Sequence, residues 1–191
     1  HVTAALSAID QRLRRPAIGL TLSTLSEGEP SAKQVSLWIP ILIAILAELG
    51  DTEYAWLLTC ELLPLLRTDS PERLARYAAE PFVLCAEISA SSEHLGRGLG
   101  GWGTGCASLL YRVVLEKLLG IEKRGNAVYL HPRVPLDWET YAVTLRFGAS
   151  TYHFSGSSDV PFVTLDGDKW NEASLPLVDD GRIHEASFPI R

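Results

Sequence analysis

Apolar residues recur at helical spacing through the first 120 positions of the chain. A first helix is predicted over 3–15, and Pro16 ends it because proline lacks a backbone N–H and crowds the preceding turn. Its apolar stripe consists of Ala5, Leu6, Ile9 and Leu13. Further helices are predicted over 36–49, 52–66, 70–79 and 107–120. The run 36–49 is apolar nearly all round, which is typical of a helix buried on most sides.

Local signals mark the ends of two of these helices. Ser70 is an N-cap residue followed by Pro71, a proline suited to the first helical position. Gly120 stands where a C-terminal capping glycine is expected after 107–119. These signals predict defined helix boundaries at both places.

Beyond Gly120 the apolar period changes to two. Short alternating runs are separated by Gly, Pro, Asp and Asn at 127–132, 141–148, 150–156, 161–167 and 183–190. This pattern predicts antiparallel strands in a sandwich or jelly-roll, with Asp179 and Asp180 in a hairpin turn before Gly181. We therefore expect an α+β chain, all-helical over 1–120 and all-β over 121–191.

Composition narrows the class of protein. With 191 residues, 47% of them hydrophobic, the chain can bury a sizeable core, and its net charge of −6 without a basic run argues against nucleic acid as a partner. The three cysteines, Cys60, Cys85 and Cys106, are interpreted as buried small residues in a reducing, cytoplasmic setting. The apolar run 35–49 is shorter than the ~20 residues that a bilayer span needs. Because the chain begins with His1 and contains no Met, we expect it to be part of a longer polypeptide.

The segment 96–105 concentrates glycine before a predicted helix. Gly96, Gly98 and Gly101 satisfy the dinucleotide pattern GxGxxG, but no acidic residue follows at the end of a second strand, so this interpretation is disfavoured. The loop ends at a helix N-terminus, where Thr104 and the amides beside Gly105 suit an anion. A tight turn without a ligand is the alternative, and both remain open on these residues alone.

Other polar and aromatic residues give weaker signals. Glu87, Glu93 and His94 lack metal-ligand spacing and are interpreted as a solvated loop, so no metal site is predicted. The histidines at 131, 153 and 184 fall on separate predicted strands and are expected at the surface or a sheet edge. Most of the five tryptophans are expected in the core, whereas Trp102, set in the glycine loop, is a candidate for stacking on a sugar.

Several blocks, taken in order, resemble glycoside hydrolase family 94. That family contains cellobiose and chitobiose phosphorylases and the C-terminal region of cyclic β-1,2-glucan synthases. The matching blocks are "ELGDTEYAWLLTCELLP", "RYAAEPFVLCAEI", "GRGLGGWGTGCASLLYRVVLEKLLGI", "VYLHPRVPLDWETYAVTLRFGASTYHF", "VTLDG" and "LPLVDDGRIHE". They are similar to family stretches such as "RYxxEPYVVAADVY" and "GRGGWTWYTGSAGWMYR".

This resemblance implies a fold, a substrate class and site residues. The fold would be the last helices of an (α/α)6 barrel, followed by a C-terminal β-sandwich. The substrates would be β-linked glucosides or glucans, with inorganic phosphate as co-substrate and no other cofactor. Thr104 and Gly105 match the Thr-Gly pair that binds phosphate in the family, and Glu80 in "EPF" matches the glutamate at the acceptor-sugar subsite.

The sequence departs from the family at two functional points. Aligning on Trp38 places Gln34 where the family has a phosphate-binding histidine. The general-acid aspartate belongs to a family stretch, "GDWND", upstream of these blocks, and "GDKWNEA" at 167–173 lies in the β part and is not interpreted as catalytic. The expected partners are thus an oligosaccharide or sugar phosphate and the remainder of the polypeptide. The alternative function is a non-catalytic carbohydrate-binding or structural module.

Overall fold

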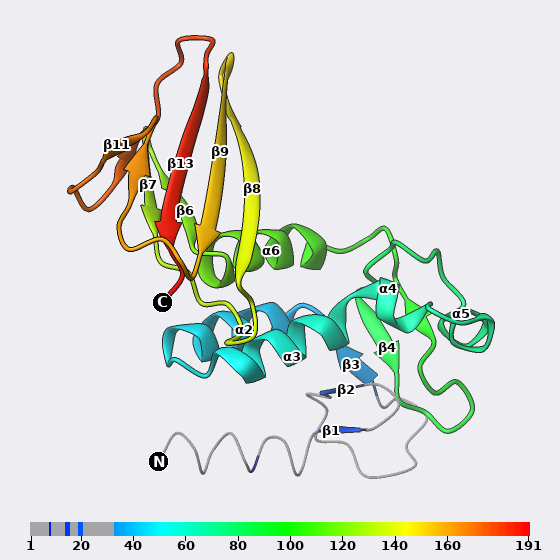
Figure 1. Ribbon diagram of the computed structural model, residues 1–191. Coiled ribbons are helices and arrows are strands. Elements are labelled where there is room, and N and C mark those ends of the chain that lie inside the picture. Colours follow the sequence, from blue (N-terminus) through cyan, green and yellow to red (C-terminus); the bar gives the residue numbers. More distant parts are fainter. Residues whose placement is uncertain (1–7, 9–13, 16–18, 21–32) are drawn as a thin grey trace. The chain divides into compact units, whose positions relative to one another are not determined.

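The computed structural model describes residues 8, 14–15, 19–20 and 33–191 (Figure 1). They divide between two compact units. The first contains the described residues up to Leu46 together with Tyr54–Val113, and the second contains Ala47–Glu53 and Val114–Arg191. The stripe predicted on the helix over 3–15 lies outside the described residues. Strand β1 (Arg14–Arg15) pairs antiparallel with β2 (Gly19–Leu20), so the expected helical end at Arg15 is wrong.

The long helical run predicted over 52–66 is divided by a proline. Helix α3 (Thr52–Leu62) ends before Pro64, which starts the short helix α4 (Pro64–Arg67). Helix α5 (Pro71–Tyr77) begins as predicted, because the Ser70 hydroxyl accepts a hydrogen bond from the Arg73 amide at 3.2 Å. The cap and the proline thus set the two helix starts.

Helix α2 (Trp38–Glu48) is less buried than its composition suggests. Ile39, Ile43 and Leu46 are almost completely buried, whereas Trp38 and Ile45 are about half exposed at 53% and 50%. The expectation of burial on most sides is therefore wrong for the described residues. The apolar pattern identified the helix but not its exposed face.

A three-stranded antiparallel sheet corrects the all-helical prediction for the first part of the chain. Strand β4 (Glu87–Ser89) lies between β3 (Lys33–Val35) and β5 (Gly98–Leu99). Gln34 pairs with Ile88, and Ile88 pairs with Gly98. This sheet brings segments from distant parts of the sequence to the glycine loop.

The longer segment of the second unit begins where helix α6 (Cys106–Val113) continues as a π-helical turn, η1 (Val114–Leu118). Gly120 follows with φ +72°, as expected of a C-terminal capping glycine. The second unit contains two sheets. The three-stranded sheet has the order β12 (Leu175–Pro176), β7 (Ala127–Leu130), β6 (Ile121–Arg124). A five-stranded sheet has the order β11 (Asp168–Lys169), β10 (Thr164–Leu165), β13 (Ile183–Pro189), β9 (Ser150–Ser157), β8 (Thr140–Phe147).

Two features of the five-stranded sheet differ from the prediction. Strands β9 and β13 pair in parallel over seven residue pairs, so the sheet is mixed rather than antiparallel. Asp180 and Gly181 do not form a hairpin turn, because β12 and β13 belong to different sheets. The Asp-Gly pair that does form a two-residue hairpin turn is Asp166–Gly167, where both residues have positive φ, as a type I′ turn requires.

Aromatic side chains fill the core of the second unit. Tyr152, Phe154 and Phe188 are at most 1% exposed. The rings of Tyr152 and Phe154 stack, and Tyr141 meets Phe188 edge to face with ring centroids 5.8 Å apart. Alternate residues of β9 are buried, which explains the period of two in the sequence.

The α2–α3 turn is fixed within the second unit by charges. Glu48 lies 3.1 Å from the Lys117 ammonium through one carboxylate oxygen and 3.1 Å from the Arg133 guanidinium through the other. Hydrogen bonding by Lys117 lowers the pKa of Glu48. The Glu53 carboxylate also accepts a hydrogen bond from the Leu136 amide.

Within the part of the chain that the structure describes, no helix is both long and apolar enough to cross a membrane.

Candidate functional site

The first half of the glycine loop is part of the β-sheet. The Ser89 amide donates to Arg97 O at 2.8 Å, and the Gly96 amide donates to Ser89 O at 2.8 Å. The Ala86 amide donates to Gly100 O at 3.2 Å. Because β4 and β5 are antiparallel, the segment lacks the parallel βαβ setting of a dinucleotide fingerprint, in agreement with the sequence analysis.

Gly98 allows this strand to lie directly against a buried tyrosine and cysteine. A Cβ atom at Gly98 would be 2.6 Å from Cys85 Sγ and 3.2 Å from the Tyr77 ring. Tyr77 is 1% exposed, and its hydroxyl donates to Val83 O at 2.7 Å and accepts from the Cys85 amide at 3.3 Å. Burial raises the pKa of Tyr77 well above its ordinary value. The early glycines of the loop therefore serve close packing.

Gly98→Val is expected to destabilise the first unit, because the added atoms overlap Cys85 and Tyr77. We expect the free energy of unfolding to fall by about 1–3 kcal/mol in chemical denaturation. Gly103→Ala is the matched control in the same loop, since a Cβ there meets no atom within 4 Å. Equal stability of the two variants would contradict this packing role.

The second half of the loop is the N-terminus of helix α6. Gly105 O accepts the first helical hydrogen bond from the Leu109 amide, and the Thr104 hydroxyl accepts from the Cys106 amide at 3.0 Å. A hydroxyl that accepts retains its own proton for donation, and the first amides of a helix have no partner within it. A Cβ at Gly103 or Gly105 would meet nothing within 4 Å, so the backbone here is sterically open. Thr104 and Gly105 thus present donors at a positive helix end.

Glu80, Phe82 and Trp102 form a surface group that we call the aromatic platform. The Trp102 indole N–H donates to Glu80 Oε1 at 3.1 Å, and the Phe82 ring meets the indole edge to face with centroids 6.3 Å apart. The two rings are 69% and 76% exposed. The hydrogen bond from Trp102 lowers the pKa of the Glu80 carboxyl, which is ionised at neutral pH. The two predicted substrate residues are therefore brought together.

Phe82 is a member of the platform that sequence reasoning missed. Its place two residues after Glu80 in "EPF" is the signal that could have identified it. A large aromatic side chain left exposed beside a second one is unusual for a surface that contacts only water.

Gln34, the residue expected from the family resemblance to replace a histidine, is 1% exposed. Its Oε1 accepts a hydrogen bond from the Arg67 guanidinium at 3.2 Å. Burial lowers the pKa of Arg67 from its usual high value. An arginine thus lies directly beside Gln34, and no sequence signal indicated this because Arg67 belongs to α4, 33 residues away.

The end of strand β3 lies beside the start of helix α6. The Cys106 thiol, 0% exposed, donates to Ser36 O at 3.1 Å, and burial raises the pKa of Cys106 to about 11. Ser36 is also 0% exposed, and its hydroxyl has no hydrogen-bond partner among the described residues. The contact places the strand that carries Gln34 next to the helix that follows Thr104.

The remaining sequence candidates do not assemble into a metal or catalytic site. Glu87 pairs with Lys33 at 2.6 Å, and the described residues contain no group of three metal-ligating side chains. Asp168 of the "GDKWNEA" stretch is exposed on β11. Cys60 is exposed, contrary to prediction, whereas Cys85 and Cys106 are buried. His184 is not an edge residue, because β13 lies between β10 and β9.

Comparison with known proteins identifies relatives but no matching family model. The chain is 36% identical over 107 residues to the cyclic beta-(1,2)-glucan synthase NdvB of Rhizobium meliloti. It is 33% identical over 106 residues to a 3-O-beta-D-glucopyranosyl-beta-D-glucuronide phosphorylase of Paenibacillus borealis. It is 32% identical over 76 residues to a cellobionic acid phosphorylase of Neurospora crassa.

These matches cover 56%, 52% and 39% of the chain, and only 4%, 13% and 10% of the respective relatives. The chain is therefore homologous to segments of a cyclic β-glucan synthase and of glycoside phosphorylases, which are the carbohydrate-active relatives expected from family 94.

Proposed function

We propose that the chain is the C-terminal segment of a phosphorylase-like enzyme that acts on β-linked glucosides or glucans. The segment would contribute sugar contacts and phosphate contacts, while the general acid comes from another part of the polypeptide. Its helices would be the last ones of an (α/α)6 barrel, followed by a β-sandwich. The observation that carries the proposal is the hydrogen bond between Trp102 and Glu80. Trp102 lies two residues before Thr104 in the sequence.

The aromatic platform has the chemistry of a sugar subsite. An aromatic face packs against the C–H surface of a pyranose ring, and an ionised carboxylate accepts hydrogen bonds from sugar hydroxyls. Glu80 uses Oε1 for Trp102, which leaves acceptor sites on both oxygens. The hydrogen bond and the edge contact with Phe82 fix the indole orientation before a sugar arrives, which lowers the entropy lost on binding.

The N-terminus of α6 has the chemistry of a phosphate subsite. The Thr104 hydroxyl and the first helical amides offer neutral donors, and the helix dipole favours negative charge. In place of a histidine, Arg67 on helix α4 supplies a cation and Gln34 on strand β3 supplies an amide. In an inverting phosphorolysis, the bound phosphate attacks the anomeric carbon while an acid protonates the leaving oxygen from the other face.

Thr104→Val is expected to weaken phosphate binding about tenfold, because it removes one donor to a charged ligand. Thr104→Ser keeps the hydroxyl and is expected to bind phosphate as the unaltered chain does. Amide chemical shifts of residues 104–107 during a titration with inorganic phosphate report the dissociation constants. Thr104→Val also removes the hydrogen bond from the Cys106 amide to the Thr104 hydroxyl, which caps helix α6. Thermal unfolding of both variants shows how far a loss of stability, rather than of the phosphate donor, accounts for the weaker binding. Unchanged phosphate affinity in Thr104→Val would refute the proposed role of Thr104.

A non-catalytic carbohydrate-binding module is the second candidate. The replacement of the family histidine by Gln34, already hydrogen-bonded to Arg67, favours it. Such a module would bind glucans at the aromatic platform with an affinity that phosphate does not change. Glucan titrations with and without phosphate therefore distinguish the two functions.

A further inference from the structure

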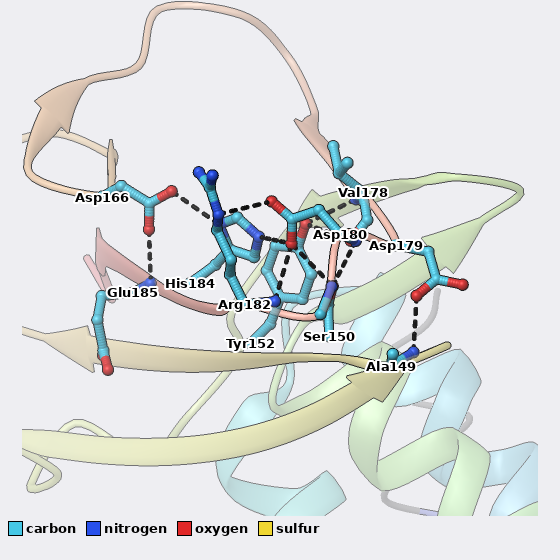
Figure 2. Close-up of polar contacts among 11 residues, drawn as sticks. Ala149, Ser150, Tyr152, Asp166, Val178, Asp179, Asp180, Arg182, His184 and Glu185 are labelled. Atoms are coloured by element: carbon cyan, nitrogen blue, oxygen red, sulfur yellow. Dashed lines mark hydrogen bonds and ion pairs between the residues drawn. The ribbon is translucent and has the colours of Figure 1, made fainter.

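His184 lies between two carboxylates that belong to different segments of the second unit (Figure 2). Its Nδ1 is 2.8 Å from Asp166 Oδ2, and its Nε2 is 3.2 Å from Asp180 Oδ1. Asp166 belongs to the β10–β11 turn, and Asp180 precedes β13 in the segment that follows β12. The His184 side chain is 12% exposed, so the contact is partly shielded from water.

The geometry requires a particular protonation state. An ionised carboxylate can only accept hydrogen bonds, so each ring nitrogen must carry a proton to satisfy the oxygen that it faces. Only the imidazolium form has both protons. A neutral ring keeps one donor, and its second nitrogen then directs a lone pair at a carboxylate oxygen.

The surroundings of His184 are defined on each neighbouring element. From β9, the Tyr152 ring stacks on the imidazole with centroids 4.6 Å apart. From the preceding segment, Arg182 Nε lies 3.6 Å from Asp180, and the Glu185 amide on β13 donates to Asp166 at 2.9 Å. The hydrogen bond with Asp166 is the leading cause that raises the pKa of His184, and Asp180 adds to it.

Both carboxylates also organise the backbone of their own segments (Figure 2). Asp180 Oδ1 accepts from the Ser150 hydroxyl at 3.1 Å and from the Arg182 amide at 3.0 Å. The Ser150 oxygen accepts in turn from the amides of Asp180 and Gly181. Loss of one His184 contact would therefore loosen a segment rather than a single side chain.

We propose that His184 is a pH-operated clamp that holds the Asp166 turn and the segment 178–182 against β13 and β9. The clamp is closed while the imidazole is protonated and opens when it loses its proton. Since the folded pKa of His184 is raised, this stabilisation is complete below the unfolded pKa of about 6.5 and is lost as pH rises through the folded value. Burial acts to raise the pKa of Asp166, but the hydrogen bond with His184 lowers that pKa overall. The closed clamp therefore also opens at low pH, when Asp166 gains a proton below about pH 3.9.

Hydrogen exchange of the full chain tests the clamp. Between about pH 6 and about pH 9, which bracket the ordinary histidine pKa, protection factors of the Arg182 and Glu185 amides are expected to fall roughly tenfold. His184→Gln is expected to show the lower protection at both pH values. His153→Gln is the matched control, because His153 is a partly buried histidine on β9 whose side chain bonds only to Thr144 among the contacts described. Equal pH dependence in the unaltered chain and in His184→Gln would overturn the proposal.

A second measurement keeps the test valid if His184→Gln does not fold. Histidine ring resonances in the full chain are expected to show that His184 titrates above the ordinary histidine pKa of about 6.5. Asp166→Asn, which retains an acceptor but removes the charge, is expected to move the His184 midpoint down towards that ordinary value. If His184 titrates at or below about 6.5 in the unaltered chain, no clamp exists.

Discussion

Gly120→Ala is expected to lower the free energy of unfolding of the second unit by more than about 3 kcal/mol. The added Cβ would lie 2.2 Å from the carbonyl carbon of His131 and 2.3 Å from Pro132 N. These are backbone atoms, held where the His131 amide donates to Gly120 O at 2.8 Å, so they cannot move aside as a flexible side chain can. The φ of +72° adds strain for any residue with a side chain.

Gly125→Ala is the matched control for this substitution. Gly125 also has a positive φ, +59°, but its Cβ would meet no atom within 4 Å. The control therefore isolates the backbone strain, which costs about 1 kcal/mol. Chemical denaturation followed by near-ultraviolet circular dichroism measures both variants. A Gly120→Ala chain no less stable than the control would show that the close approach to His131 is not required.

Trp102→Ala is expected to weaken binding of a β-linked glucose disaccharide roughly 10- to 100-fold, the range for removing an aromatic anchor from an interface. The substitution removes the stacking surface and also leaves Glu80 without its indole donor. Because the indole is 76% exposed, its loss is expected to change the stability of the fold little. Isothermal titration calorimetry measures the affinity directly.

Two variants distinguish stacking from a general disturbance of the surface. Trp102→Phe retains an aromatic face without the N–H, and we expect it to keep part of the affinity. Trp38→Ala removes another exposed tryptophan, on α2, and is expected to bind the disaccharide normally. A similar loss in the Trp38 variant would argue against a specific role for the platform.

Local signals in the sequence predicted two helix boundaries, at Ser70 and Gly120, and the longer strands of the second unit, but not β6, β11 or β12. Ser70 caps α5 because its hydroxyl reaches an amide three residues later, and Gly120 adopts the left-handed backbone that a capping glycine permits. The alternation in 150–156 matches the buried positions of β9. In each case the cause lies within a few residues of the signal.

Non-local pairing could not be predicted in the same way. The parallel alignment of β9 with β13 depends on the path of the chain between them, and no pattern within either strand encodes it. Strand β3 has only three residues, too few to show an alternating pattern, and it pairs with β4 more than 50 positions later in the sequence. The hydrogen bond from Arg67 to Gln34 joins residues 33 positions apart, which explains why sequence spacing did not indicate it.

The candidate site was partly predictable because the N-terminus of α6 is formed by residues that are neighbours in the sequence. The position of Thr104 at the start of α6 followed from the glycine-to-helix transition, and the structure shows the hydroxyl at the Cys106 amide. The early glycines, by contrast, suggested a phosphate loop but lie against Cys85 and Tyr77. The roles of Thr104, Gly105, Glu80 and Trp102 in ligand binding remain predictions.

The central proposal is that the aromatic platform and the N-terminus of α6 form one sugar and phosphate site. Calorimetric titration of the full chain with a β-linked glucose disaccharide, with and without saturating inorganic phosphate, tests it most directly. The proposal predicts that phosphate changes the disaccharide affinity, that the disaccharide changes the phosphate affinity by the same factor, and that Thr104→Val needs about tenfold more phosphate to produce this change. Disaccharide binding that phosphate leaves unchanged, or no binding of either ligand, would contradict it.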